Sequence, residues 1–131
     1  MYEGGCLCGA LRYSFQSAPD DAGYCHCRLC QRSSGAPVLA WATFPAEAFR
    51  YTQGAPGVFK SSEWGQREFC RDCGTQLLFR NTADKKTVDL NMVTLNDPEQ
   101  LEPEYHIYTE SRLKWFEIAD HLPRYKHDIP K

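Results

Sequence analysis

Seven cysteines fall into three short groups whose spacing is typical of metal ligands. The groups read C-x-C, C-x-C-x-x-C and C-x-x-C, and they are formed in turn by Cys6 and Cys8, by Cys25, Cys27 and Cys30, and by Cys70 and Cys73. Thiolates so close in sequence can converge on one ion, whereas such neighbours seldom form an unstrained disulfide framework. The odd count, without the charged and apolar regions of a secretion signal, also disfavours disulfides. The sequence therefore predicts metal binding.

The seven cysteines divide naturally into four and three. Four thiolates close a structural zinc site, whereas three leave one coordination position open, as in catalytic zinc sites. Gly9 and Gly74 follow the last cysteine of the first and third groups, and glycine permits the tight turn that aims backbone amides at thiolate sulfurs. Gln31 follows the middle group instead. We therefore predict a closed site and an open site, formed by Cys6, Cys8, Cys70 and Cys73 and by Cys25, Cys27 and Cys30, respectively.

A second division of the cysteines is still open from the sequence. Paired C-x-x-C motifs build zinc ribbons, and this chain offers them at residues 27–30 and 70–73. That division leaves Cys6, Cys8 and Cys25 without a role, which favours the first one. A redox function of the motif at residues 70–73 is disfavoured, because no βαβ pattern surrounds it.

An open zinc site with three thiolates favours sulfur chemistry. A soft exogenous thiol is a suitable fourth ligand, and coordination lowers its pKa from about 8.5. A thiolate held in this way can attack a small electrophile. We therefore expect carbon–sulfur bond making or breaking rather than amide hydrolysis, which usually employs histidine and carboxylate ligands. The candidate catalytic residues are Cys25, Cys27 and Cys30.

The sequence gives weaker evidence of a functional role for the histidines and arginines near the open site. His26 lies between two ligands and in an extended segment would point away from them, so we expect it to bond to nearby backbone. His106 is expected to be a partly buried strand residue, with a fourth metal ligand as the minority alternative. Arg28 and Arg32 flank the site, where they could attract an anionic substrate or simply be solvated.

Length and composition predict one domain, residues 1–131, that depends on metal. The hydrophobic fraction of 42% includes all seven cysteines, so the core is thin if they are ligands. Structural zinc can supply about 10–16 kcal/mol of apparent binding free energy, which becomes folding free energy if the apo site is unformed. We therefore predict a poorly folded apoprotein.

Charge and hydropathy exclude some classes of partner. The net charge is −2 and no basic stripe is evident, so we expect no nucleic-acid partner. The longest mostly apolar run, residues 36–44, is too short to span a bilayer, and we expect no membrane partner. A cytoplasmic location, where thiols stay reduced, is expected.

Strand signals dominate the chain. Short runs rich in strand-forming residues, several of them alternating in polarity, occur at residues 11–15, 38–44, 58–60, 67–69, 76–79, 87–95, 105–108 and 115–118. Helical turns are expected at residues 29–33 and 97–101, where Asp97 can cap and Pro98 suits the first helical position. The pattern predicts a mainly β fold of many short antiparallel strands stabilised by zinc.

The combined motifs resemble the glutathione-dependent formaldehyde-activating enzyme family, also called the GFA or CENP-V domain. The resemblance is carried by the three cysteine-containing stretches at residues 5–13, 25–36 and 69–77. It extends to a C-terminal pattern that includes His106, Ile107, Tyr108, Ser111, Arg112, Trp115 and residues 120–123.

This resemblance implies a tent-like, zinc-bearing β fold with two zinc ions per chain. It implies structural zinc at Cys6, Cys8, Cys70 and Cys73 and catalytic zinc at Cys25, Cys27 and Cys30. The implied reaction joins glutathione to formaldehyde, a small aldehyde, and its reverse is a carbon–sulfur lyase reaction. Some relatives act in chromosome or cytoskeletal organisation, so the alternative is a non-catalytic zinc module that mediates protein interaction.

Overall fold

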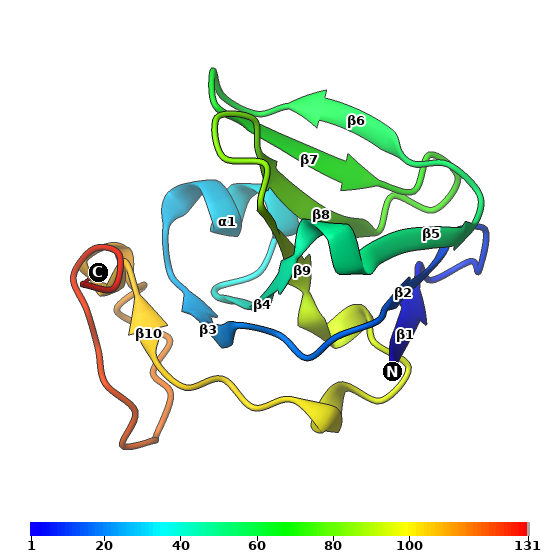
Figure 1. The fold of residues 1–131 in the computed structure, drawn as a ribbon. Helices are drawn as coiled ribbons and strands as arrows, with labels where there is room; N and C mark the ends of the chain where they lie inside the picture. The colour runs from blue at the N-terminus through cyan, green and yellow to red at the C-terminus, as the bar shows by residue number, and fades with distance from the viewer. Residues whose placement is uncertain (131) are drawn as a thin grey trace.

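The computed structural model describes residues 1–130 of the chain and is mainly β (Figure 1). Its smaller sheet has the strand order β1-β2-β5, with bounds Tyr2–Gly5, Arg12–Phe15 and Phe49–Gln53. Its larger sheet has the order β10-β3-β4-β9-β8-β7-β6. In chain order, those seven strands are β3 Asp21–Cys25, β4 Leu39–Pro45, β6 Gly57–Lys60, β7 Gly65–Phe69, β8 Gln76–Asn81, β9 Thr87–Asn91 and β10 His106–Ile107.

Helical structure is short. The α-helix α1 spans Arg28–Ser34, in agreement with the turn predicted there. Single 3₁₀ turns are η1 Ala46–Ala48, η2 Met92–Thr94, η3 Pro98–Gln100 and η4 Thr109–Ser111. In η3, the Asp97 side chain accepts a hydrogen bond from the Glu99 amide, as its predicted capping role requires. No helix within residues 1–130 has the length and apolar character needed to cross a membrane.

The main core lies between the two sheets. Phe15 of β2 stacks on Phe44 of β4 with ring centroids 3.7 Å apart, and neither ring is accessible to solvent. Leu78, Leu90 and Ala42 are cross-strand neighbours in the large sheet and face the same core. Because successive strand residues point to opposite faces, the side chains between them lie on the other face of the large sheet. That second face is the one beside α1.

The C-terminal segment and a second buried cluster lie at the β3 end of the large sheet. The chain that follows β10 lies at the β3 end, far from β6 at the opposite end of the strand order (Figure 1). A second buried cluster forms at the β3 end around Cys25, Tyr105 and Ile107. The open site predicted from sequence therefore lies where β3 enters α1, beside the C-terminal segment.

Three strands were not predicted, and one prediction was wrong. The missed strands are β1, β3 and β5. Residues 115–118 are not a strand, because their carbonyl groups pair with arginines instead of with a neighbouring strand. Arg112 donates to Phe116 O at 3.1 Å, and Arg124 donates to Ile118 O at 2.8 Å. The predicted antiparallel arrangement holds for every strand pair in residues 1–130 except β10 with β3, which is parallel.

Candidate metal centres

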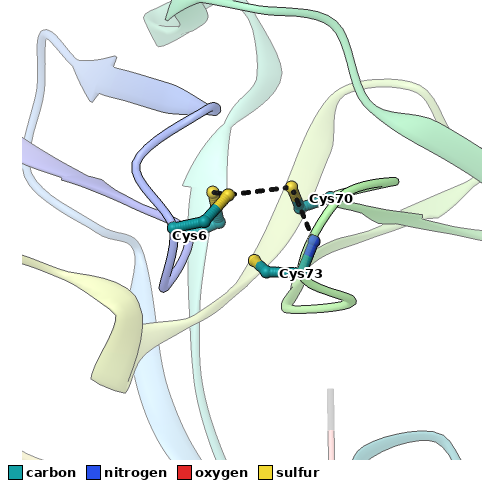
Figure 2. A group of neighbouring side chains, drawn as sticks. Cys6, Cys70 and Cys73 are labelled. Atoms are coloured by element: carbon teal, nitrogen blue, oxygen red, sulfur yellow. Dashed lines mark hydrogen bonds between the residues drawn. The ribbon is translucent and has the colours of Figure 1, made fainter.

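Four thiols from two stretches far apart in the sequence meet in one cluster. Each of Cys6, Cys8, Cys70 and Cys73 contributes a sulfur that lies within 4.8 Å of the other three. The Cys8 sulfur is 3.7 Å from the sulfurs of both Cys6 and Cys70. A tetrahedral zinc ion with Zn–S bonds of about 2.3 Å requires sulfurs about 3.8 Å apart, so the spacing fits zinc. Figure 2 shows the thiols of Cys6, Cys70 and Cys73 turned toward a common centre.

Two glycine turns shape this four-cysteine cluster. Gly9 and Gly74 both have φ of +82°, a conformation that favours glycine, so the predicted tight turns are confirmed. Backbone amides then point at sulfur. Leu11 N lies 3.2 Å from the Cys6 sulfur. Cys73 N lies 3.5 Å from the Cys70 sulfur, a contact that Figure 2 draws as a dashed line. These amides stabilise thiolate charge, which metal binding requires.

Thr75 joins the two halves of the four-cysteine cluster, and sequence reasoning gave it no role. Its hydroxyl oxygen accepts a hydrogen bond from Leu7 N at 3.1 Å and lies 3.3 Å from the Cys73 sulfur. That hydroxyl, with the Thr75 amide, lowers the pKa of Cys73 to about 5. A hydroxyl residue two positions after the last cysteine was the only signal in the sequence that pointed to it.

The other three thiols form a separate cluster where β3 enters α1. The sulfurs of Cys25, Cys27 and Cys30 all lie within 4.8 Å of one another. Cys25 ends β3 and is buried, while Cys27 caps α1 by accepting a hydrogen bond from Cys30 N at 3.3 Å. The structure groups the cysteines as four and three, and it does not bring residues 27–30 together with residues 70–73 as a zinc ribbon would.

Neighbouring thiolates in the three-cysteine cluster would repel one another unless a cation lies between them. Hydrogen bonds from Cys25 and Cys30 hold the pKa of Cys27 well below its usual range. The same contacts raise the pKa of Cys25, because a second thiolate would lie beside the first. All three thiolates can form together only around a cation. An all-sulfur donor set suits zinc, so the residues present fit that metal.

The neighbouring histidines are engaged elsewhere. Nε2 of His26 lies 2.8 Å from Nδ1 of His106, and Nε2 of His106 lies 2.9 Å from Oδ2 of Asp120. His26 therefore bonds to a side chain and not to nearby backbone as predicted. His106 is 1% exposed, so it is more deeply buried than the sequence suggested. Both ring nitrogens of His106 are occupied, and it is not a member of the three-cysteine cluster.

The donor and acceptor roles in this chain of bonds follow from Asp120. Despite partial desolvation, hydrogen bonds from His106, Leu122 N and Arg124 lower the pKa of Asp120 to about 2. The ionised carboxylate can only accept, so a neutral His106 donates through Nε2 and accepts through Nδ1. His26 must then donate through Nε2. Its own Nδ1 is left without a partner among residues 1–130, and burial lowers the pKa of His26 to about 4.

A small cavity lies beside these histidines. It has a volume of about 40 Å³ and is lined by both rings and by residues of the C-terminal segment, among them Arg112 and Arg124. A volume of about 10–15 Å³ is enough for one water, so the cavity has room for water beside the histidine pair. The C-terminal segment thus completes the surroundings of the loop that carries the three-cysteine cluster.

Comparisons with known proteins identify relatives of this chain. A family model described as "Glutathione-dependent formaldehyde-activating enzyme" matches residues 1–111. A curated relative, the uncharacterized lyase C29B12.13 of Schizosaccharomyces pombe, is 30% identical over 90 residues. The alignment covers 69% of this chain and 65% of that relative, so the chain spans less than two thirds of the relative's length.

A solved structure shares the fold. The crystal structure of a protein from Rhodobacter sphaeroides superposes with a TM-score of 0.62 at 26% identity, covering 77% of this chain and 96% of that one. The family model includes every cysteine of both clusters within its matched residues. On this match, the chain belongs to the glutathione-dependent formaldehyde-activating enzyme family.

Proposed function

We propose that this chain is a zinc-dependent enzyme of the carbon–sulfur lyase type that acts on a thiol adduct. The proposed substrates are glutathione and formaldehyde, and the product is S-hydroxymethylglutathione. The observation that carries the proposal is the three-cysteine cluster, which offers three thiol donors to a metal while the nearby histidines bond to each other and to Asp120. The four-cysteine cluster would hold a second, structural zinc.

The two clusters would have different chemical roles. Zinc bound by Cys25, Cys27 and Cys30 would supply an open position that takes up a thiol and lowers its pKa. The protein's part is to hold the three sulfurs together. Cys25 does so from the end of a paired strand and Cys27 from the N-cap of α1. This anchoring keeps the position available to substrate.

The proposed reaction balances without an external oxidant or reductant. The thiolate sulfur forms a bond to the formaldehyde carbon, and the electron pair of the carbon–oxygen π bond moves to oxygen. That oxygen takes up a proton equivalent to the one lost by the thiol. In the reverse direction, the carbon–sulfur bond breaks. The family description and the lyase name of the Schizosaccharomyces pombe relative support this class of reaction.

The alternative is a non-catalytic zinc module that mediates protein interaction. It requires a protein group to close the three-cysteine site. The engagement of His26 and His106 in their own hydrogen bonds counts against a histidine in that position. We therefore favour the enzyme.

The proposed activity can be tested against its spontaneous background. Exchange NMR of glutathione with formaldehyde measures S-hydroxymethylglutathione formation directly, with and without zinc-loaded protein. We expect the protein to accelerate exchange, and we expect Cys27→Ser to abolish the acceleration while the four-cysteine cluster keeps its zinc. Full acceleration by the Cys27→Ser variant would refute the proposed role of the cluster.

A further inference from the structure

A groove runs between α1 and the far end of the large sheet. Its volume is about 500 Å³, within the range of about 300–1,000 Å³ found for small-molecule sites. Leu29, Arg32 and Ser33 of α1 line one side. Phe59 and Arg67, from β6 and β7, are among the residues that line the other. Cys30 belongs to the same helix, so the groove and the three-cysteine cluster share α1.

Arg67 is a largely buried charge that forms no ion pair. Its side chain is 9% exposed, lines the groove and places the guanidinium 5.0 Å from the centroid of the Phe79 ring. Within residues 1–130 it forms no ion pair and no side-chain hydrogen bond. Burying an unpaired charge is unfavourable, so such a group is retained where a ligand supplies the missing partner.

Two acidic residues close to Arg67 in the sheet, Glu68 and Asp89, bond to other side chains. Glu68 follows Arg67 directly, so it lies on the opposite face of β7, where it bonds to Arg80 and accepts a hydrogen bond from Tyr51 at 2.8 Å. Asp89 lies two strands away across Phe79, and it accepts a hydrogen bond from Thr43 at 2.6 Å. Neither carboxylate forms an ion pair with the Arg67 guanidinium.

We infer that this groove binds a carboxylate of the thiol substrate, with Arg67 as its main partner and Arg32 at the rim. The inference rests on the proposed function, since it places the substrate's sulfur at the three-cysteine cluster. Arg pairs with carboxylate through two parallel hydrogen bonds, which gives geometric specificity as well as affinity. The site therefore selects peptide thiols with free carboxylates over neutral thiols.

The test uses S-methylglutathione, which keeps both carboxylates but has no thiol to ionise. Its affinity for the zinc-loaded protein is measured by calorimetry beside that of its dimethyl ester, in which both carboxylates are neutralised. The wild type should bind the acid about ten- to a hundredfold more tightly than the ester. Arg67→Gln should weaken binding of the acid by a similar factor and leave the ester unchanged.

Two further variants keep the test decisive. Arg32→Gln alters an exposed side chain, so it is expected to fold, and it should weaken binding of the acid about two- to fivefold. Arg50→Gln makes the same chemical change at an exposed position on β5 and should have no effect. Equal affinity for acid and ester, undiminished affinity of Arg67→Gln for the acid, or no binding by the wild type would overturn the inference.

The outcome separates this inference from the proposed reaction. Arginine-dependent binding of the acid without accelerated formaldehyde exchange would support the groove and refute the proposed activity. The opposite outcome is that the wild type and both variants accelerate exchange equally well with glutathione and with its dimethyl ester. That result would support the proposed activity and refute carboxylate binding in the groove.

Discussion

His26 and His106 are separated by 80 positions in the chain, yet their rings share a hydrogen bond of 2.8 Å. Asp120 fixes the far side of His106, and Gln31 donates to the His26 carbonyl at 2.9 Å. The residue between two members of the three-cysteine cluster is thus held by the C-terminal segment on one side and by α1 on the other. Residues outside the three-cysteine cluster therefore hold the loop that carries it.

Replacing His106 with alanine should destabilise the protein strongly. The change leaves the buried Nε2 of His26 without an acceptor and opens a cavity, so we expect a loss of about 2–4 kcal/mol of unfolding free energy. Urea unfolding of zinc-loaded protein measures this loss. His127→Ala is the matched control, because His127 is 73% exposed in its side chain and pairs only with the exposed Glu110. A loss in His106→Ala no larger than that of the control would contradict the role assigned to the histidine pair.

Replacing Thr75 with valine should weaken metal binding at the four-cysteine cluster. Valine has nearly the same shape but no hydroxyl, so the pKa of Cys73 would rise and Leu7 N would lose its acceptor. Outer partners of metal ligands typically contribute about ten- to a hundredfold in metal affinity. Competition with a zinc chelator measures the change. Thr52→Val, at an exposed position on β5, is the control, and equal zinc affinity in the two variants would refute the prediction.

Asp89 should make the stability of the protein depend on pH. Burial raises the pKa of Asp89 from 3.8 to about 6. Between these values the folded state binds more protons than the unfolded state, so ionisation of Asp89 destabilises the fold as pH rises through that window. Above pH 6 the full penalty is present, and Asp89→Asn should then stabilise the protein by about 1–2 kcal/mol.

The comparison of Asp89→Asn with the wild type cancels any effect of pH on the thiolates, since both proteins share them. Thermal melts at pH 7.5 and at pH 5.0 provide the measurement, with exposed Asp20→Asn as the control. The stabilising effect should be larger at pH 7.5. An equal effect at both pH values would show that Asp89 is not the origin of the dependence.

Much of the candidate site was predictable from the sequence, because metal ligands are local in sequence. The order of the three cysteine groups and the glycines after two of them predicted the division that the folded chain shows. The histidine bonds were not predictable, because His26 meets His106 only after β10 pairs with β3. No spacing rule connects residues so far apart in the chain.

The fold was predictable as a class but not strand by strand. β3 has Gly23 in its centre and an aspartate at its start, both unusual in strands, so tertiary pairing with β4 decides its conformation. Residues 115–118 have strand-like composition, but arginine side chains take up their carbonyl groups. Neither the pairing of β3 with β4 nor the arginine hydrogen bonds to residues 115–118 can be predicted from the local sequence pattern.

Removing metal should unfold much of the chain. Cys6, Cys70 and Cys73 belong to or pack against the main core, so loss of zinc would leave like-charged or protonated thiols at its edge. We expect chelation to abolish most near-ultraviolet circular dichroism and readdition of zinc to restore it. An unchanged spectrum in metal-free protein would contradict the structural role of the four-cysteine cluster.

The most direct test of this account is the zinc content of each chain, in protein expressed with added zinc and purified without chelator. We expect two zinc ions in the wild type. We expect one in a variant with Cys25, Cys27 and Cys30 all changed to serine. A single zinc in the wild type, or two in the triple variant, would contradict the division of the cysteines into a closed and an open site.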